Sequence, residues 1–145
     1  MSLALPDKYV RKAIFTALTG LNVDGYDIAT YDTNTTGSNP LFYILMTTQT
    51  NNELDGSKCG RRWFSSILLD VVTRYDGAGN TGSRLLADNI AEAARVLIKD
   101  LDLEAGSCQK ITQRTLNFPN VISTNTYTTY IFRKFIRLEL EIDKL

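Results

Sequence analysis

Two stretches of the chain repeat apolar residues at the spacing of an α-helix. The first begins near Pro6, a residue tolerated in a first helical turn, and is predicted to end near Gly20. Its buried stripe is predicted to consist of Val10, Ile14, Ala17, Leu18 and Leu21. The second covers 84–101, with Gly106 as its terminator. Its wide apolar face is predicted to contain Leu86, Ile90, Ala93, Ala94, Leu97, Ile98 and Leu101.

Five other stretches alternate between apolar and polar residues and are predicted to be strands. They cover 26–32, 41–50, 61–76, 110–116 and 127–142. The last is the longest, with Ile136 and Leu138 on one face and Arg137 and Glu139 on the other. Such alternation is typical of antiparallel sheets with one solvated face. The pattern therefore predicts one α+β domain over 1–145: an antiparallel sheet of about five strands, with two helices packed on one face.

Two polar stretches separate these elements and are expected to be loops. They are 33–39 and 51–60, and both are longer than a tight hairpin requires. Long surface loops commonly carry contacts with other molecules rather than hold the fold together. The second loop is therefore a candidate docking element.

Composition and charge exclude several classes of function. The chain has 145 residues, 43% hydrophobic and 22% charged, which is ordinary for a globular domain. Sixteen basic residues balance sixteen acidic ones, so no overall field attracts nucleic acid or a membrane. The chain has no histidine, which removes the commonest general base and most zinc sites. Cys59 and Cys108 lack the spacing of a metal knuckle or redox pair and are expected to be free thiols. We expect no catalytic residue, cofactor or metal.

A glycine-rich turn offers an alternative function. Residues 77–82 fit the spacing G-x-G-x-x-G of dinucleotide-binding loops. Such a loop, however, follows an almost wholly apolar parallel strand, and this strand ends in Thr73-Arg74-Tyr75-Asp76. Asp100 lies at the expected distance for an acidic ribose ligand, but inside the predicted helix. We interpret the turn as a connection whose following helix is capped by Thr81 or Ser83, and keep a small nucleotide-binding enzyme as the alternative.

The final strand offers a second alternative, because bases and aromatics are interleaved there. Between 105 and 138 the chain has five bases and no acid. Single-stranded nucleic acid is bound by such combinations of charge and stacking. The aromatics and bases concerned are Tyr127, Tyr130, Phe132, Arg133, Lys134, Phe135 and Arg137. The simpler interpretation is a solvated strand whose neighbour in the sheet carries Asp or Glu. The acidic pairs Asp24 with Asp27 and Glu139 with Glu141 are expected to be turn residues and an exposed strand edge, not a hydrolytic site.

The order of elements resembles a known family. A short amphipathic helix leads through a strand and a loop to Asn39-Pro40-Leu41-Phe42-Tyr43-Ile44, where the chain enters its central sheet. A polar hairpin, a strand ending Leu69-Asp70-Val71-Val72-Thr73, a small-residue turn, the helix 84–101 and a long final strand follow. This layout resembles the tail terminator, or tail-completion, proteins of long-tailed bacteriophages. The loop 33–39 and the final strand are longer than that family leads one to expect, which leaves a head-to-tail neck adaptor or another tail component open.

The resemblance implies a function and a set of partners. Proteins of that family are small α+β subunits without catalytic residues, which form a ring, usually of six, where the tail tube meets the neck. The expected partners are other copies of the chain, the tail tube protein and a neck or head-completion protein. DNA would pass through the lumen as cargo, and no membrane is involved. The subunit would be assembled in the host cytoplasm and located at the tail-neck junction of the virion.

Eight residues are predicted to make these contacts. Opposite charges on one face of the last strand would let the basic part of one subunit meet the acidic part of the next. The candidate subunit interface consists of Arg133, Arg137, Glu139 and Glu141. The candidate loop for docking to the tail tube contains Asn52, Glu53, Asp55 and Lys58.

Overall fold

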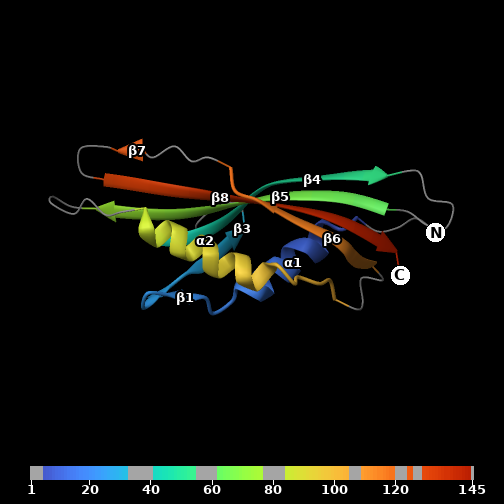
Figure 1. The fold of residues 1–145 in the computed structure, drawn as a ribbon, viewed down its shortest axis with the longest axis horizontal. Helices are drawn as coiled ribbons and strands as arrows, with labels where there is room; N and C mark the ends of the chain where they lie inside the picture. Colours follow the sequence, from blue (N-terminus) through green and yellow to red (C-terminus); the bar gives the residue numbers. More distant parts are fainter. Residues whose placement is uncertain are drawn as a thin grey trace.

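The computed structural model describes residues 5–32, 41–54, 62–76, 84–104, 109–119, 124–125 and 129–144. These form a long sheet with both helices on one face (Figure 1). The elements in chain order are α1 (Asp7–Leu18), β1 (Asn22–Val23), β2 (Tyr26–Asp27), β3 (Ala29–Asp32), β4 (Phe42–Leu54), β5 (Arg62–Asp76), α2 (Leu85–Ile98), β6 (Gln109–Asn117), β7 (Thr124–Asn125) and β8 (Thr129–Lys144). The α+β architecture with two helices on one face is confirmed.

The main sheet is mixed, so the prediction of a purely antiparallel sheet is wrong. Its strand order is β3-β4-β5-β8-β6, with the short β7 also paired to β8, while β1 and β2 form a separate two-stranded sheet. β3 runs parallel to β4, and the other pairs in the main sheet are antiparallel. Parallel neighbours need a crossover connection instead of a tight hairpin. Alternation along a short edge strand is the same in either direction, so the sequence pattern could not reveal its orientation.

Both helices are held to the sheet by one apolar stripe each. Val10, Ile14 and Leu18 follow one another at intervals of four in α1 and are fully buried. The chain leaves α1 through Gly20, whose φ of +80° is one that glycine adopts without strain. This confirms the predicted start and end of the first helix.

The second helix is shorter than predicted. α2 ends at Ile98, before Gly106, which lies outside the described residues. Leu101 is nevertheless buried, because the chain turns back toward the sheet after the helix. Leu97 was expected in the apolar face but is 42% exposed. The periodic pattern continued past the real helix end because Leu101 reaches the same core by another backbone path.

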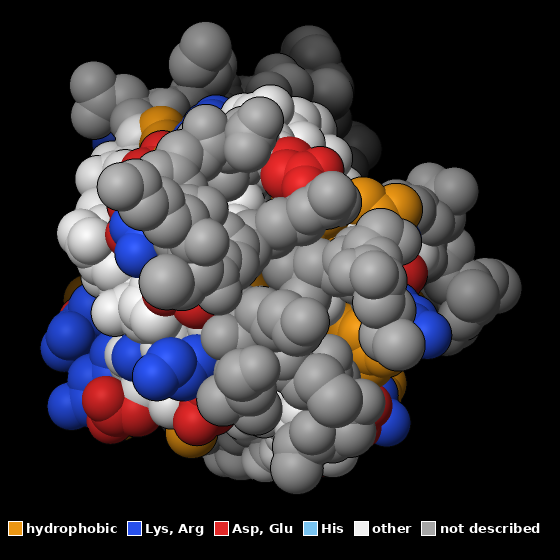
Figure 2. Space-filling model, turned by 90° about the vertical axis from the view of Figure 1, so that its right-hand side faces the viewer, with side chains coloured by type: hydrophobic (Ala, Val, Ile, Leu, Met, Phe, Trp, Pro, Cys, Tyr) orange, Lys and Arg blue, Asp and Glu red, His pale blue; other side chains and the backbone are white. Residues whose placement is uncertain are grey.

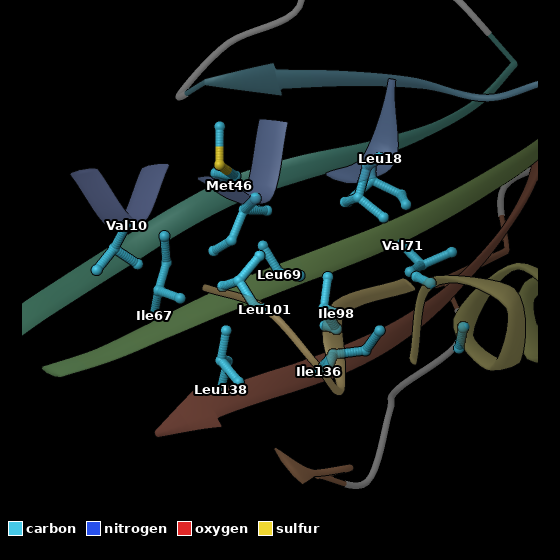
Figure 3. Packing of buried hydrophobic residues seen from close by; sticks show 14 of the residues in the cluster. Val10, Leu18, Met46, Ile67, Leu69, Val71, Ile98, Leu101, Ile136 and Leu138 are labelled. Carbon is cyan, nitrogen blue, oxygen red and sulfur yellow. The ribbon is translucent and has the colours of Figure 1, made fainter. Parts of the chain in front are cut away.

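The core lies between the helices and one face of the sheet. Across the strands, Leu69 of β5 lies opposite Met46 of β4 and Ile136 of β8, and all three are almost inaccessible to solvent. Figure 3 shows these side chains together with Val10 and Leu18 of α1 and Ile98 of α2. Burial of this many apolar side chains is the main stabilising contribution to the fold.

A β-bulge in β4 connects this strand to the start of α1. The register with β5 shifts between Met46 and Gln49, so the side chains that follow change faces. Gln49 then accepts a hydrogen bond from Arg11 Nε at 2.7 Å, and Asn51 donates to the carboxylate of Asp7. The bulge therefore turns polar residues toward the first turn of the helix, where they hold it in place.

Candidate subunit interface

The main sheet has a second face, opposite the helices, which we call the open face. It carries the alternate positions of β4, β5 and β8, and all four residues of the predicted interface lie on it. Its members are Tyr43, Leu45, Thr50, Asn52, Arg62, Phe64, Ser66, Leu68, Asp70, Val72, Arg74, Ile131, Arg133, Phe135, Arg137, Glu139, Glu141 and Asp143. The prediction that the core lies on the other side of the last strand is confirmed by the burial of Ile136, Leu138, Leu140 and Ile142.

The centre of the open face is apolar, which the sequence analysis did not anticipate. Val72 is 3% exposed, and Leu45, Leu68 and Phe135 are half-buried. At the edge of this area the rings of Tyr31 and Tyr43 meet edge-on, with centroids 6.0 Å apart. A solvated sheet face would carry polar residues at these positions. The signal was present in the alternation of β5, where Phe64 and Leu68 share a face with Asp70.

Asp70 is a buried carboxylate in the middle of this apolar area. Its side chain lies 3.6 Å from Arg133, measured from Oδ2 to Nε, and the residue as a whole is 5% exposed. Burial raises the pKa of Asp70 above its ordinary value, and the positive charge of Arg133 opposes that rise. The simpler interpretation of the basic last strand, a neighbouring strand that carries an acid, is confirmed for Arg133.

The four predicted interface residues differ in how they are paired. Arg133 contacts Asp70, and Glu141 lies 3.7 Å from the guanidinium of Arg62, which also binds Asp143 at 2.7 Å. Arg137 and Glu139 form no ion pair with any residue that the structure describes. They lie two positions apart on the same face of β8. Of the four, these two have charges that remain available to another subunit.

The predicted docking loop is in part a strand. Asn52 and Glu53 belong to β4, where they lie opposite Phe64 and Trp63 of β5. Their assignment to a loop is therefore wrong, because the ladder between β4 and β5 continues through these polar residues to Leu54. Asp55 and Lys58 lie outside the described residues. A role of this hairpin in docking stays a prediction.

The described residues near the glycine turn do not favour a phosphate site. Residues 77–83 are outside the described part of the chain. The N-cap of α2 is Arg84, which makes no side-chain capping hydrogen bond, so the predicted cap at Thr81 or Ser83 is wrong. α2 begins directly after this segment with an acidic residue in its first turn, Asp88, which pairs with Lys134 at 3.5 Å. An acid at this position occupies the electrostatic role that a bound phosphate would have. Asp100 follows the end of α2 and lies on no strand tip.

The basic and aromatic residues of the last strand are divided between two faces. Arg133, Phe135 and Arg137 are on the open face, whereas Phe132 and Lys134 are on the helix side. Tyr127 is outside the described residues. Figure 2, a view from the right-hand end of Figure 1, shows described Lys and Arg side chains interspersed with Asp and Glu. A nucleic-acid groove would gather its bases and stacking rings on one surface.

The remaining acidic pairs also have structural roles. Asp24 has a φ of +54° and precedes Gly25 in the turn between β1 and β2, and Asp27 accepts a hydrogen bond from Asn22 at 2.9 Å. Glu139 and Glu141 lie on β8, which is flanked by β5 and β6, so the expectation of a strand edge is wrong. Within the described ranges, no three His, Cys, Asp or Glu residues are grouped as metal ligands. None of the described helices is both long and apolar enough to cross a membrane.

A groove lies on the opposite side of the molecule from the open face. It lies between α1 and the segment after α2, has a volume of about 470 Å³, and includes Ala13, Ala17 and Leu97 in its lining. At its rim, Lys12 and Glu104 form an ion pair of 2.7 Å. The groove is open to solvent, and the charges of Lys12 and Glu104 compensate each other at its rim.

Comparison with known proteins shows the fold. No family description matches the sequence, and no curated protein is significantly similar to it. Among solved structures, a chain from the "Virion of native gene transfer agent (GTA) particle" is similar to this one. The alignment covers 94% of this chain and 96% of that chain, with a TM-score of 0.58 and 16% sequence identity. The two chains share a fold over almost their whole lengths.

Proposed function

We propose that this chain is a structural subunit of a phage-like virion, a ring-forming tail terminator where the tail tube meets the neck. The observation that carries the proposal is the fold similarity, nearly end to end, to a chain of a gene transfer agent particle. The layout of elements along the sequence supports the same conclusion independently.

The open face supplies the contact that a ring requires. It combines an apolar centre with charges of both signs, and Arg137 and Glu139 lack partners among the described residues. Interfaces between subunits have this composition, an apolar core inside a polar rim. Heterologous contacts between unlike parts of a surface close into rings when the rotation between neighbours permits. We propose that Arg137 of one copy pairs with Glu139 of the next.

An exchange of charge tests this pairing. Arg137→Glu and Glu139→Arg should each shift the purified protein from ring to monomer in analytical ultracentrifugation, because each brings like charges together. The double variant, with both changes in one chain, should recover the ring. The matched control exchanges Lys12 and Glu104, an exposed pair on the helix side, and should leave assembly unchanged. Failure of the double variant to recover assembly would contradict the Arg137–Glu139 contact.

Location in the particle separates a terminator from a neck adaptor or another tail component. A terminator caps the tube, so particles made without it should carry tails of uncontrolled length. A neck adaptor joins two finished parts, so its loss should leave tails of normal length detached from heads. Electron microscopy of particles from a deletion strain distinguishes these results. Particles of normal appearance without the protein would contradict a virion role.

A further inference from the structure

Asp70 is an unusual residue for the surface on which it lies. It occupies the centre of the open face, opposite Leu45 on one neighbouring strand and Phe135 on the other. Both helices pack on the other side of the sheet (Figure 1). The side chain of Asp70 is nevertheless only 8% exposed. A buried charge is unfavourable unless it is paired and fully hydrogen-bonded.

The hydrogen bonding of Asp70 is incomplete. Its Oδ2 is 3.6 Å from Arg133 Nε, close enough for an ion pair but too long for a hydrogen bond. Its Oδ1 is buried and has no hydrogen-bond partner. The side chain of Arg133 is itself 46% exposed, so much of its charge is solvated. The isolated subunit therefore contains a carboxylate in which one buried oxygen accepts no hydrogen bond.

We propose that a second copy of this chain packs on the open face and donates hydrogen bonds from an Arg or Lys side chain to the carboxylate of Asp70, which turns as the neighbour docks so that Oδ1 also gains a donor. The inference rests on the ring proposed above and identifies the centre of its interface. A cationic donor completes both the charge and the hydrogen bonding of the carboxylate. The surrounding Leu45, Leu68, Val72 and Phe135 exclude water once the neighbour is in place, as the residues around an interface hot spot do.

Charge complementarity favours a copy of the same chain as the occupant. The chain offers exposed bases that form no ion pair within the described structure, among them Lys99 and Lys110. A metal ion is disfavoured, because Asp70 belongs to no group of three possible ligands among the described residues. Nucleic acid is disfavoured because its phosphates would be brought toward a buried carboxylate.

A buried acid of this kind would also fix the geometry of the ring. The apolar area alone would tolerate several relative positions of two subunits. A single carboxylate that requires a donor admits only the arrangement that supplies one, so specificity comes from the penalty on all others. The isolated subunit is less stable for it, and the assembled ring recovers that stability.

The substitution Asp70→Asn tests the proposal, since it removes the charge and keeps the shape. We expect the subunit to melt at or above the temperature of the parent at neutral pH, because a buried charge is gone. We expect the dissociation constant of the ring to rise by about tenfold or more, the usual effect of a central hot-spot residue. Asp100→Asn, an exposed acid on the helix side, is the matched control and should change neither quantity.

A photo-crosslinking residue in place of Phe135 gives an answer that does not depend on the Asp70 variant folding. Position 135 lies directly opposite Asp70, so in an assembled ring it should crosslink to another copy. Mass spectrometry of the product would identify the segment that contributes the base. Crosslinks confined to the same chain, or Asp70→Asn rings as stable as those of the parent, would overturn the inference while leaving the ring intact. A parent protein that stays monomeric would contradict the proposed function itself.

Discussion

The two faces of the sheet are built from the same three strands and differ by a single residue position. On the helix side, Leu69 lies between Met46 and Ile136, and the row is wholly apolar and sealed. One position along each strand, on the open face, Asp70 lies between Leu45 and Phe135. The residues of the first row are already buried within the subunit and need no other molecule to cover them. The second row contains a carboxylate whose Oδ1 has no hydrogen-bond partner, as expected if another molecule packs on the open face.

The largest expected effect is a difference in monomer stability between alanine variants of two adjacent leucines, one on each face of the sheet. Leu69→Ala removes a fully buried side chain from the core, so unfolding should become easier by about 2–5 kcal/mol. Leu68→Ala, its immediate neighbour on the open face, is half-buried and should cost about 1 kcal/mol or less in the monomer. Urea denaturation of both variants measures the difference.

The same two substitutions should affect the strength of assembly in the opposite order. At a concentration where both variants are folded, Leu68→Ala should weaken the ring and Leu69→Ala should not. If Leu68→Ala and Leu69→Ala lowered the free energy of unfolding of the monomer equally, the open face would be as much a part of the core as the helix side.

The effect of a charge reversal on monomer stability should depend on whether the residue already forms an ion pair within the subunit. Arg133→Glu places a second carboxylate beside Asp70, and we expect the monomer to lose about 1–2 kcal/mol, because the site is half-exposed and partly screened. Arg137→Glu should leave monomer stability within about 0.5 kcal/mol and act on assembly alone. Thermal unfolding, read beside sedimentation, separates the two. A destabilised Arg137→Glu monomer would reveal an intramolecular role for that residue.

The sequence predicted the helix side of this comparison well. Helical spacing located α1 and α2, and period-two alternation located β4, β5, β6 and β8 and the face that β8 buries. These patterns are reliable because a one-residue slip would expose a whole apolar face. The sequence could not show that β3 is parallel to β4, nor that a bulge carries β4 on through Leu54. Both depend on which strands become neighbours, which local periodicity does not encode.

The candidate site was predicted in outline and not in detail. Its four charged residues were placed on the correct face of the last strand. Alternation along one strand, however, cannot indicate that Arg133 would meet Asp70 on β5, or that Glu141 would meet Arg62. Those pairs bring together residues 63 and 79 positions apart in the chain. The role of Asp70 becomes visible only once the register between β5 and β8 is known.

A smaller effect on monomer stability is expected when the pH is varied, because of the buried carboxylate of Asp70 on the open face. Because burial raises the pKa of Asp70 above 3.8, the folded subunit holds the proton more tightly than the unfolded chain. Monomer stability from this group is therefore full below pH 3.8 and decreases as the pH rises through the folded pKa. Asp70→Asn lacks this dependence, so its advantage over the parent should vanish in acid and reach about 1 kcal/mol or less at neutral pH. Melting curves across this range test the sign, and an advantage that grows in acid would contradict it.

The smallest effect is expected in the glycine turn. If 77–82 only connects β5 to α2, Gly79→Ala should cost at most about 1 kcal/mol, more if the residue needs a positive φ. No nucleotide should change the melting temperature of the parent. Thermal stabilisation of the parent by a dinucleotide or triphosphate would favour the nucleotide-binding alternative.

The order of the strands also has a consequence for the timing of folding. β5 lies at the middle of the sheet, but its partner β8 follows it only after α2 and β6, and Arg62 pairs with Asp143 across 81 residues. Contacts so distant along the chain form late and slowly, because a long loop must close first. During synthesis on a ribosome, one edge of β5 would stay unpaired until β8 emerged. The open face, which spans both strands, would form only then, so a partly made chain could not yet use it in the proposed ring.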